Sequence, residues 1–270
     1  MFGELLIAGY TLFALNIPSI FPMRLNAIPE PEISAQSVLV IDTETGKSFY
    51  QKNPQDILPL ASLVKLPSAL VVLENVPLEK EIILTQEVID TPGTIGNFRT
   101  GERAQARHLL FSSLIASSND ALMGLVSSVG LTNFTSLLQN KKIQLGLKST
   151  VMNDPVGVSP KTRANAWEVA KMAKAAFSNN FLRKVLSIPE YEFVSLSGIA
   201  HKNISTNKLI FDPRVLVAKT GTLQDIENYA ALVKPTNSDR ELIMVVLGSL
   251  DRGKDVRVLL DWLDEAYVWK

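Results

Sequence analysis

Residues 215–248 read VLVAKTGTLQDIENYAALVKPTNSDRELIMVVLG, and this stretch decides the fold class. It contains three strand-like runs, at 215–219, 228–234 and 241–248, and residues 235–239 are typical of the turn between the last two. Two further β-rich runs around a glycine-containing turn predict a hairpin near the start of the chain, at 37–42 and 47–51. Both ends of the chain therefore predict strands of one antiparallel sheet, with about five strands in all.

The middle of the chain has apolar residues at helical spacing. We expect one helix over 59–75, two or three packed helices within 104–145, and another helix over 162–177. Residues 76–103 are broken by Pro and Gly and predict short strands and loops, and a closing helix from Lys254 to about Tyr267 carries an apolar face that can back the sheet. The expected fold is α+β, an antiparallel sheet flanked by helices with an all-α lobe beside it.

The composition excludes several classes of function. The chain has 270 residues, 27 Lys plus Arg against 27 Asp plus Glu, two His and no Cys. A neutral chain lacks the basic excess of nucleic-acid binders, so we expect no nucleic-acid partner. Thiolate metal sites and cysteine nucleophiles are excluded, and His108 and His201 are expected as a helix residue and a loop residue rather than as metal ligands. We therefore expect no His-built metal centre and a catalytic base other than imidazole.

The N-terminal residues form a separate region in this interpretation. Residues 5–23 are apolar except for Asn16, which predicts a membrane anchor or an imperfect export signal, with a buried start of the fold as the alternative. Pro29-Glu-Pro-Glu32 is typical of a short stiff linker. We therefore divide the chain into an N-terminal segment and linker, 1–33, and a folded domain, 34–270.

Ser62-Leu-Val-Lys65 is the first candidate for chemistry. A Ser and a Lys three residues apart lie on one face of a helix, and a Lys whose pKa is depressed can act as a general base toward the hydroxyl. The pattern alone is weak, because Ser205-Thr-Asn-Lys208 also matches it.

Two further motifs give Ser62 and Lys65 a context. Ser117-Ser-Asn119 lies between two apolar helical runs, and Lys219-Thr-Gly221 ends a strand-like run and is followed by Thr222. The ordered set S-x-x-K, S-x-N and K-T-G is the motif set of active-site serine β-lactamases and penicillin-binding proteins. The order of the three motifs, and the type of element that carries each, argue against a chance occurrence.

With these motifs the chain resembles the serine D-alanyl-D-alanine carboxypeptidases, the low-molecular-mass penicillin-binding proteins. The likeness covers about residues 34–250 and includes Asn153-Asp-Pro-Val-Gly157 and Asn207-Lys-Leu209. It implies the β-lactamase/transpeptidase-like fold, an extracytoplasmic location, peptidoglycan stem peptides as substrates and β-lactams as covalent inhibitors. Pro67 within the nucleophile helix and Ser118 in place of a more usual Gly are departures from the family pattern.

The resemblance also implies a role for each motif residue, with no metal and no cofactor required. Ser62 is the expected nucleophile, Lys65 its base, and Ser117 a proton relay to the leaving amine. Substrate contacts are expected from Asn119, Lys219, Thr220, Gly221 and Thr222, and the backbone N–H groups of Ser62 and Thr222 are the expected oxyanion hole.

Three alternatives to a carboxypeptidase remain open at this stage. An endopeptidase that cleaves cross-links has the same motifs. A β-lactamase of the class A type needs a Glu that activates water, and the Glu between residues 149 and 180 is Glu168, in a context that reads as helix surface. A non-catalytic module that senses β-lactams or peptidoglycan is the third alternative.

Overall fold

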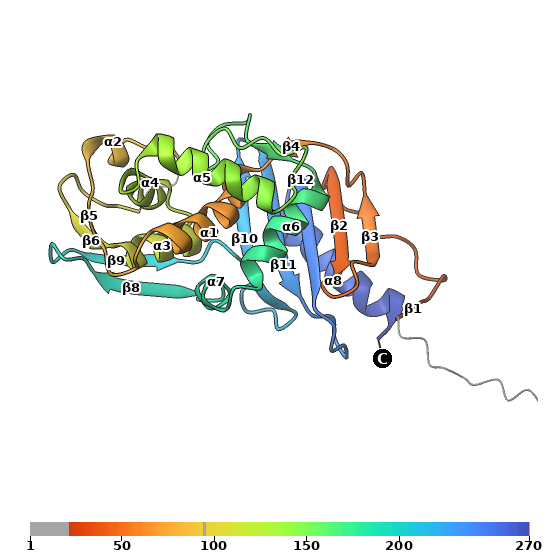
Figure 1. Cartoon of the computed structure of the whole chain (residues 1–270). Coiled ribbons are helices and arrows are strands. Elements are labelled where there is room, and N and C mark those ends of the chain that lie inside the picture. Colours follow the sequence, from red (N-terminus) through yellow and green to blue (C-terminus); the bar gives the residue numbers. More distant parts are fainter. Residues whose placement is uncertain (1–21, 94–95, 270) are drawn as a thin grey trace, which may run out of the picture.

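A five-stranded antiparallel sheet forms the centre of this computed structural model, which describes residues 22–93 and 96–269 (Figure 1). Its order is β10-β11-β12-β2-β3, with bounds Val215–Leu223, Ile226–Val233, Leu242–Ser249, Ser37–Asp42 and Ser48–Lys52. The two chain ends meet where β12 pairs with β2, with Leu242 opposite Asp42. The prediction of one antiparallel sheet built from both ends of the chain is confirmed.

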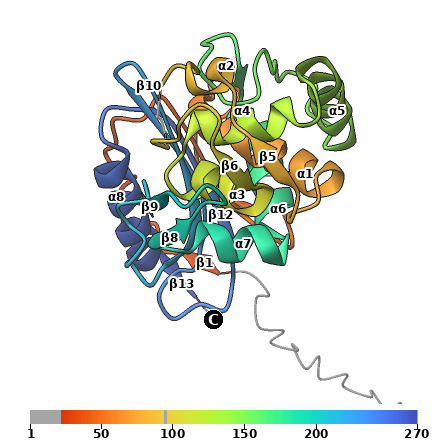
Figure 2. The same ribbon diagram turned by 90° about the vertical axis from the view of Figure 1, so that its left-hand side faces the viewer.

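The two faces of the sheet are covered by different helices. Along β12, Leu242, Met244 and Val246 face α8 (Arg252–Ala266), while the alternating residues face the opposite layer, which includes α6 (Ala166–Phe177) (Figure 2). Side chains alternate between faces along a strand, so a strand covered on both sides must be apolar throughout. This requirement explains the continuous apolar run in the last third of the sequence.

A helical lobe packs beside the sheet and completes the α+β fold (Figure 1). It contains α1 (Lys65–Asn75), α2 (Gln86–Ile89), α3 (Ala106–Ile115), α4 (Asn119–Ser127), α5 (Leu131–Gln144) and α7 (Asn180–Leu186). Two small two-stranded antiparallel sheets border it: β5–β6 (Glu81–Ile83 with Arg103–Gln105) and the hairpin β8–β9 (Glu190–Val194 with Ala200–Ile204). Three helices within 104–145 match the sequence prediction.

The structure corrects several predictions about individual elements. The β10 strand continues to Leu223, so Lys219-Thr-Gly221 lies inside the strand instead of at its end. The helix predicted from residue 162 begins at Ala166, because β7 (Arg163–Ala164) first pairs with β4 (Leu58–Pro59). His201 lies in β9 and is buried, so its prediction as a loop residue was wrong.

Pro67 is accommodated by a change of helix type. The nucleophile segment is a short 3₁₀ helix, η1 (Ala61–Val64), and the α-helix begins only at Lys65. Pro67 is therefore the third residue of α1, within the first turn, where backbone N–H groups have no partner inside the helix. This proline thus lies where a helix tolerates it.

Residues 23–33 lie against the C-terminal helix. The β1 strand (Met23–Arg24) pairs with β13 (Tyr267–Val268), and the indole N–H of Trp262 donates to the Pro29 carbonyl at 2.7 Å. The predicted linker is thus packed on α8. The apolar segment predicted at 5–23 falls outside the described residues, apart from its last two.

The described residues contain no single helix with the length and hydropathy needed to cross a membrane. One bent pair, α4 with α5, meets those criteria only when its two helices are taken together across a 102° bend.

Candidate active site

The segment that carries Ser62 is fixed directly on the sheet. The Asn228 amide donates to the Pro59 carbonyl at 2.8 Å, and its oxygen accepts the Gly248 N–H at 2.9 Å. Opposite Asn228 in the β-ladder is Gly221, where an added Cβ would lie 2.9 Å from the Leu60 carbonyl oxygen and 3.3 Å from the Ser62 nitrogen. The backbone of β10 therefore approaches the Ser62 N–H closely, and this approach requires glycine at position 221.

Ser62 and Lys65 are in hydrogen-bond contact. The Lys65 ammonium lies 2.8 Å from Ser62 Oγ, contacts Asn119 Oδ1, and donates to the Val156 carbonyl at 3.0 Å. Lys65 begins α1 and Asn119 begins α4, so the helical lobe supplies two of the three side chains. The half-buried Ser62 hydroxyl is thus in position to transfer its proton to Lys65.

Burial sets the protonation of Lys65. Its side chain is completely buried, and this loss of hydration lowers its pKa to about 7, although the carboxylates of Asp154 and Asp120 act in the opposite direction. A lysine that is half deprotonated near neutral pH can accept a proton from a serine.

Ser117 and Lys219 form a second pair. The Lys219 ammonium donates to Ser117 Oγ at 2.9 Å and to the Thr220 carbonyl at 3.1 Å. Burial, with the nearby Lys65 and Arg252 charges, holds the pKa of Lys219 well below its usual range.

Ser117 has a φ of +62°, a costly conformation for a residue with a Cβ, and Ala61, directly before Ser62, has a φ of +49°. The backbone is therefore strained beside both serines.

A loop anchored by Asp154 closes the site below Lys65. The Asp154 carboxylate accepts backbone N–H groups from Val156, Val158 and Ser159 at 3.0 to 3.1 Å, and also one from Gly157. This arrangement fixes the Val156 carbonyl that Lys65 contacts. Gly157 has a φ of +87°, and an added Cβ would lie 2.0 Å from the Ala61 carbonyl oxygen, so the loop packs directly under the nucleophile segment.

Arg252 is a site residue that the sequence patterns did not reveal. Its guanidinium donates to the Gly221 carbonyl at 3.0 Å and to Thr222 Oγ1 at 2.7 Å. Arg252 comes 30 residues after Thr222 in the chain and belongs to no motif, and the sheet topology alone brings the start of α8 to β10. The Thr220 hydroxyl is held at 2.6 Å by Thr206.

A family profile described as D-alanyl-D-alanine carboxypeptidase matches residues 25–250. The chain belongs to this family.

Relatives in the family carry two names. A D-alanyl-D-alanine endopeptidase of Pseudomonas aeruginosa is 27% identical over 253 residues, which are 88% of this chain and 80% of that protein. The D-alanyl-D-alanine carboxypeptidase DacF of Bacillus subtilis is 25% identical over 245 residues, which are 86% of this chain and 63% of that protein.

Solved structures share the fold. A D-alanyl-D-alanine carboxypeptidase from Mycobacterium tuberculosis superimposes with a TM-score of 0.80 at 21% identity, covering 92% of this chain and 98% of that one. A Streptomyces DD-transpeptidase does so with a TM-score of 0.80 at 20% identity, covering 87% and 98%. The transpeptidase-like fold predicted from the motifs is confirmed.

Glu168 does not face the nucleophile of this family member. Its carboxylate accepts the Ser149 N–H at 2.8 Å and the Thr150 hydroxyl at 2.5 Å, and so secures the two residues before Val151, which pairs with Arg163. Both carboxylate oxygens are used in this structural role, which argues against Glu168 as the base of a class A β-lactamase. Within the described residues, no cluster of three His, Cys, Asp or Glu could hold a metal ion.

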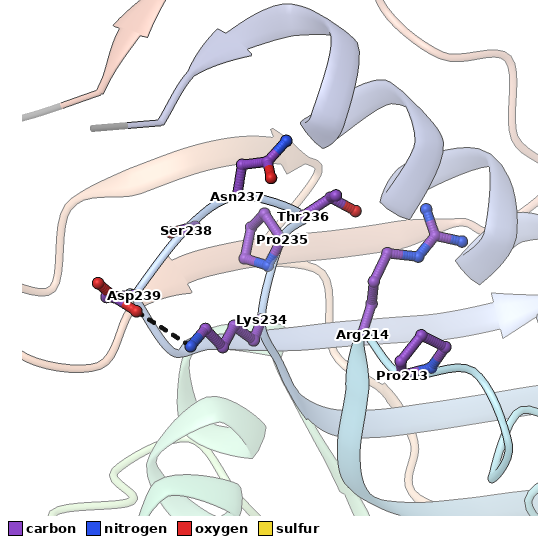
Figure 3. Close-up of a pocket in the computed structure, with 8 residues that line it drawn as sticks. All are labelled: Pro213, Arg214, Lys234, Pro235, Thr236, Asn237, Ser238 and Asp239. Carbon is purple, nitrogen blue, oxygen red and sulfur yellow. Dashed lines mark hydrogen bonds and ion pairs between the residues drawn. The ribbon is translucent and has the colours of Figure 1, made fainter.

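One surface pocket of this D-alanyl-D-alanine carboxypeptidase family member lies away from the site (Figure 3). It is lined by residues 213–214, just before β10 begins, and by residues 234–239, just after β11 ends. Its cations are ion-paired: Arg214 contacts Asp212, Asp261 and Asp264, and Lys234 contacts Asp239 at 3.2 Å. This pocket therefore offers no unneutralised charge to a ligand.

Proposed function

We propose that the chain is a serine D-alanyl-D-alanine carboxypeptidase that acts through an acyl-enzyme on Ser62. One observation carries this proposal: a completely buried lysine, with a pKa of about 7, lies 2.8 Å from a serine hydroxyl in a member of this peptidase family. Such a lysine is a competent base at neutral pH, and the chain needs neither a metal nor a cofactor for this chemistry.

In the acylation step, Lys65 takes the proton of Ser62 Oγ while the oxygen attacks the carbonyl carbon of the penultimate D-alanine. The negative charge that develops on the carbonyl oxygen is stabilised by the backbone N–H groups of Ser62 and Thr222, each worth roughly 3 kcal/mol. Gly221, next to Ser62 in space, allows the two segments to approach closely enough for both groups to reach one oxygen.

The tetrahedral intermediate collapses when the C–N bond breaks and D-alanine leaves as an amine. Its proton comes from the lysine pair through Ser117, which is hydrogen-bonded to Lys219. Water then attacks the ester, again with loss of a proton to Lys65, and returns Ser62 to its hydroxyl form. Asn119 orients the substrate amide, and its contact with Lys65 keeps the ammonium in line with Ser62.

The terminal carboxylate of the substrate is assigned to the edge of β10. Lys219, Thr220, Thr222 and Arg252 lie along this edge, and Arg252 is held by the strand itself. A guanidinium suits a planar carboxylate because it offers parallel N–H donors. An extended peptide lying beside Gly221 meets no side chain there.

The cellular setting follows from the substrate. Peptidoglycan stem peptides lie outside the cytoplasmic membrane, so we place the enzyme in an extracytoplasmic compartment, and β-lactams are expected as covalent inhibitors. Membrane contact through residues 5–23 remains part of this proposal, and we expect no nucleic-acid partner.

A fluorescent penicillin tests the mechanism. The wild type should be labelled covalently, Ser62→Ala should not, and Ser136→Ala, which removes an exposed hydroxyl on α5, should be labelled like the wild type. Labelling of a folded Ser62→Ala variant, or none of the wild type, would overturn the proposal. A wild type that is labelled but releases no product from any peptide would favour the sensor alternative.

A D-alanyl-D-alanine endopeptidase is the second candidate, because relatives of that name match as well as the carboxypeptidases do. The two activities are separated by incubating the enzyme with a pentapeptide that ends in D-alanyl-D-alanine and, in parallel, with a cross-linked muropeptide dimer. Release of D-alanine identifies the carboxypeptidase, and conversion of dimer to monomer identifies the endopeptidase.

A further inference from the structure

A buried pair of titratable side chains lies outside the residues used above. His201 Nε2 lies 2.6 Å from Glu102 Oε1, and the side chains are 4% and 0% exposed. His201 comes from β9, and Glu102 directly precedes β6, so the pair joins the β8–β9 hairpin to the segment before β6. Burying polar side chains away from water costs free energy unless they are hydrogen-bonded or paired. We therefore expect this buried pair to have a structural role.

The Glu102 end of the pair holds a turn in place. Its second oxygen accepts the Arg99 N–H at 3.0 Å, and the backbone of residues 101–102 pairs with Leu84. The Phe98 ring stacks on His201 with centroids 4.4 Å apart, and His201 also stacks on Phe193 at 4.9 Å. Residues 98–102 are therefore clamped by one histidine through both a hydrogen bond and a ring contact.

Residues on both sides of positions 94–95 contact the S-x-N motif. The Pro92 carbonyl accepts the Asn119 amide at 2.7 Å, and the Gly96 N–H donates to both oxygens of Asp120 at 2.8 and 2.9 Å. An added Cβ on Gly93 would lie 2.5 Å from Asn119 Nδ2, and one on Gly96 would lie 2.8 Å from Ser118 Oγ. Asn119 is thus held between Lys65 on one side and Pro92 on the other.

We propose that Glu102 and His201 are positioning residues, whose buried pair holds residues 96–99 on the Ser118-Asn119-Asp120 stretch through the Gly96–Asp120 contact and thereby keeps the Lys65–Asn119 contact closed to water. This inference rests on the proposed function, since it assigns the pair to the acylation step. Neither residue touches the reacting atoms.

The expected signature is a shifted pH profile. Lys65 is faced by Ser62, Asn119 and the Val156 carbonyl, with Asp120, Asp154 and Lys219 as the nearby charges. Its low pKa is caused mainly by burial, so water that reaches it after the segment loosens will raise its pKa. The acidic limb of the acylation rate then moves to higher pH, which a general loss of stability would not cause.

The test uses the double variant Glu102→Met/His201→Phe in the full chain. Removing one partner alone would leave the other buried polar side chain without its hydrogen-bond partner and threaten folding, whereas replacing both by apolar residues of similar size is often tolerated. We expect the acidic limb of acylation by a fluorescent penicillin to move up by about one pH unit, so that the rate below neutral pH falls about tenfold. The single variant Glu102→Gln keeps a hydrogen-bonding partner for His201, so its pH profile of acylation should stay close to that of the wild type.

The matched control is Lys202→Gln, one residue further along β9. Lys202 is half exposed and pairs with Glu190 and Glu192 on the opposite face of the hairpin, so its profile should equal that of the wild type. A folded double variant whose acidic limb coincides with those of the wild type and Lys202→Gln would overturn the proposal.

Hydrogen exchange separates this inference from the proposed function. Absence of acylation in the wild type would be a failure of the function alone. In that case, hydrogen exchange of the Gly96 amide still tests the inference about Glu102 and His201. It is measured by mass spectrometry on peptides from 91–100. The double variant should lose protection there at least tenfold relative to Lys202→Gln, and unchanged protection would refute the clamp.

Discussion

Lys65 lies completely buried, and that burial gives it a pKa of about 7. Only the neutral amine can accept the Ser62 proton, and protonation increases as the pH falls below the pKa. We expect the second-order rate of penicillin acylation to fall about tenfold per unit below pH 7 and to level off above it. Stopped-flow labelling from pH 5 to 9 measures this, and a rate that is flat between pH 5 and 7 would contradict the assignment of Lys65 as base.

The same low pKa has a consequence for stability. The unfolded chain keeps Lys65 protonated up to its usual pKa near 10.5, so between about pH 7 and 10.5 the unfolded state binds more protons than the folded state. The destabilising effect of Lys65 is therefore fully present below pH 7 and disappears as the pH approaches 10.5.

Lys65→Met isolates this effect. The unfolding free energy of the wild type should rise relative to that of the variant by up to about 1.4 kcal/mol per pH unit between pH 7 and 10. Urea titrations of both proteins at pH 7, 8 and 9 give the difference. The effect of burial on Lys219 is common to both proteins, whereas the part of its pKa shift that comes from the Lys65 charge is lost in the variant. A difference that does not change with pH would mean that Lys65 stays protonated in the folded protein.

Among the structural elements, the loop at 153–159 packs tightly against the nucleophile segment. Gly157→Ala places a methyl group 2.0 Å from the Ala61 carbonyl oxygen and adds the strain of a positive φ, so either the loop or Ser62 must move. We expect a loss of at least 2 kcal/mol in stability and at least a tenfold slower acylation. Gly46→Ala is the matched control, because its φ is +71° and an added Cβ meets nothing within 4 Å. Equal effects of the two substitutions would show that only φ strain matters.

Strands with two buried faces, and helices with regular apolar spacing, could be predicted from the sequence because their periodicity is local. The motifs placed Ser62, Lys65, Ser117, Asn119 and Lys219 together, and the structure brings all five into two hydrogen-bonded groups. Arg252, Asn228 and Glu102 could not be found in this way. Their roles depend on contacts across more than 20 residues, which no local pattern records.

The β8–β9 hairpin was missed for a related reason. Its inward side carries Tyr191 and Phe193, but the outward side carries Glu190, Glu192 and Lys202, and β8 begins only a few residues after the short helix α7. Two five-residue strands give only a weak period of two. Packing on α3, which the sequence does not state, makes them stable.

At the scale of the whole molecule, residues 23–33 belong to the folded unit. They supply β1, the Pro29 carbonyl bound by Trp262, and the apolar contacts of Ile28 and Ile33 with the α8 layer. A chain that begins at Ser34 should therefore be less stable than one that begins at Pro22, by about 2 kcal/mol or more. Urea unfolding of the two chains measures the difference, and coincident midpoints would show that the domain indeed begins at Ser34.

The pairing of β12 with β2 joins residues about 200 positions apart, and this affects the order of events during synthesis. Ser62, Lys65 and Asn119 leave the ribosome early, whereas β10, which carries Lys219 and the Thr222 N–H, needs β11 and β12 before it can join β2. Contacts of such long sequence separation form late and slowly. Under the proposed mechanism, the growing chain has Ser62 and Lys65 but no oxyanion hole, and we expect it to react with penicillin only when its last strands are in place.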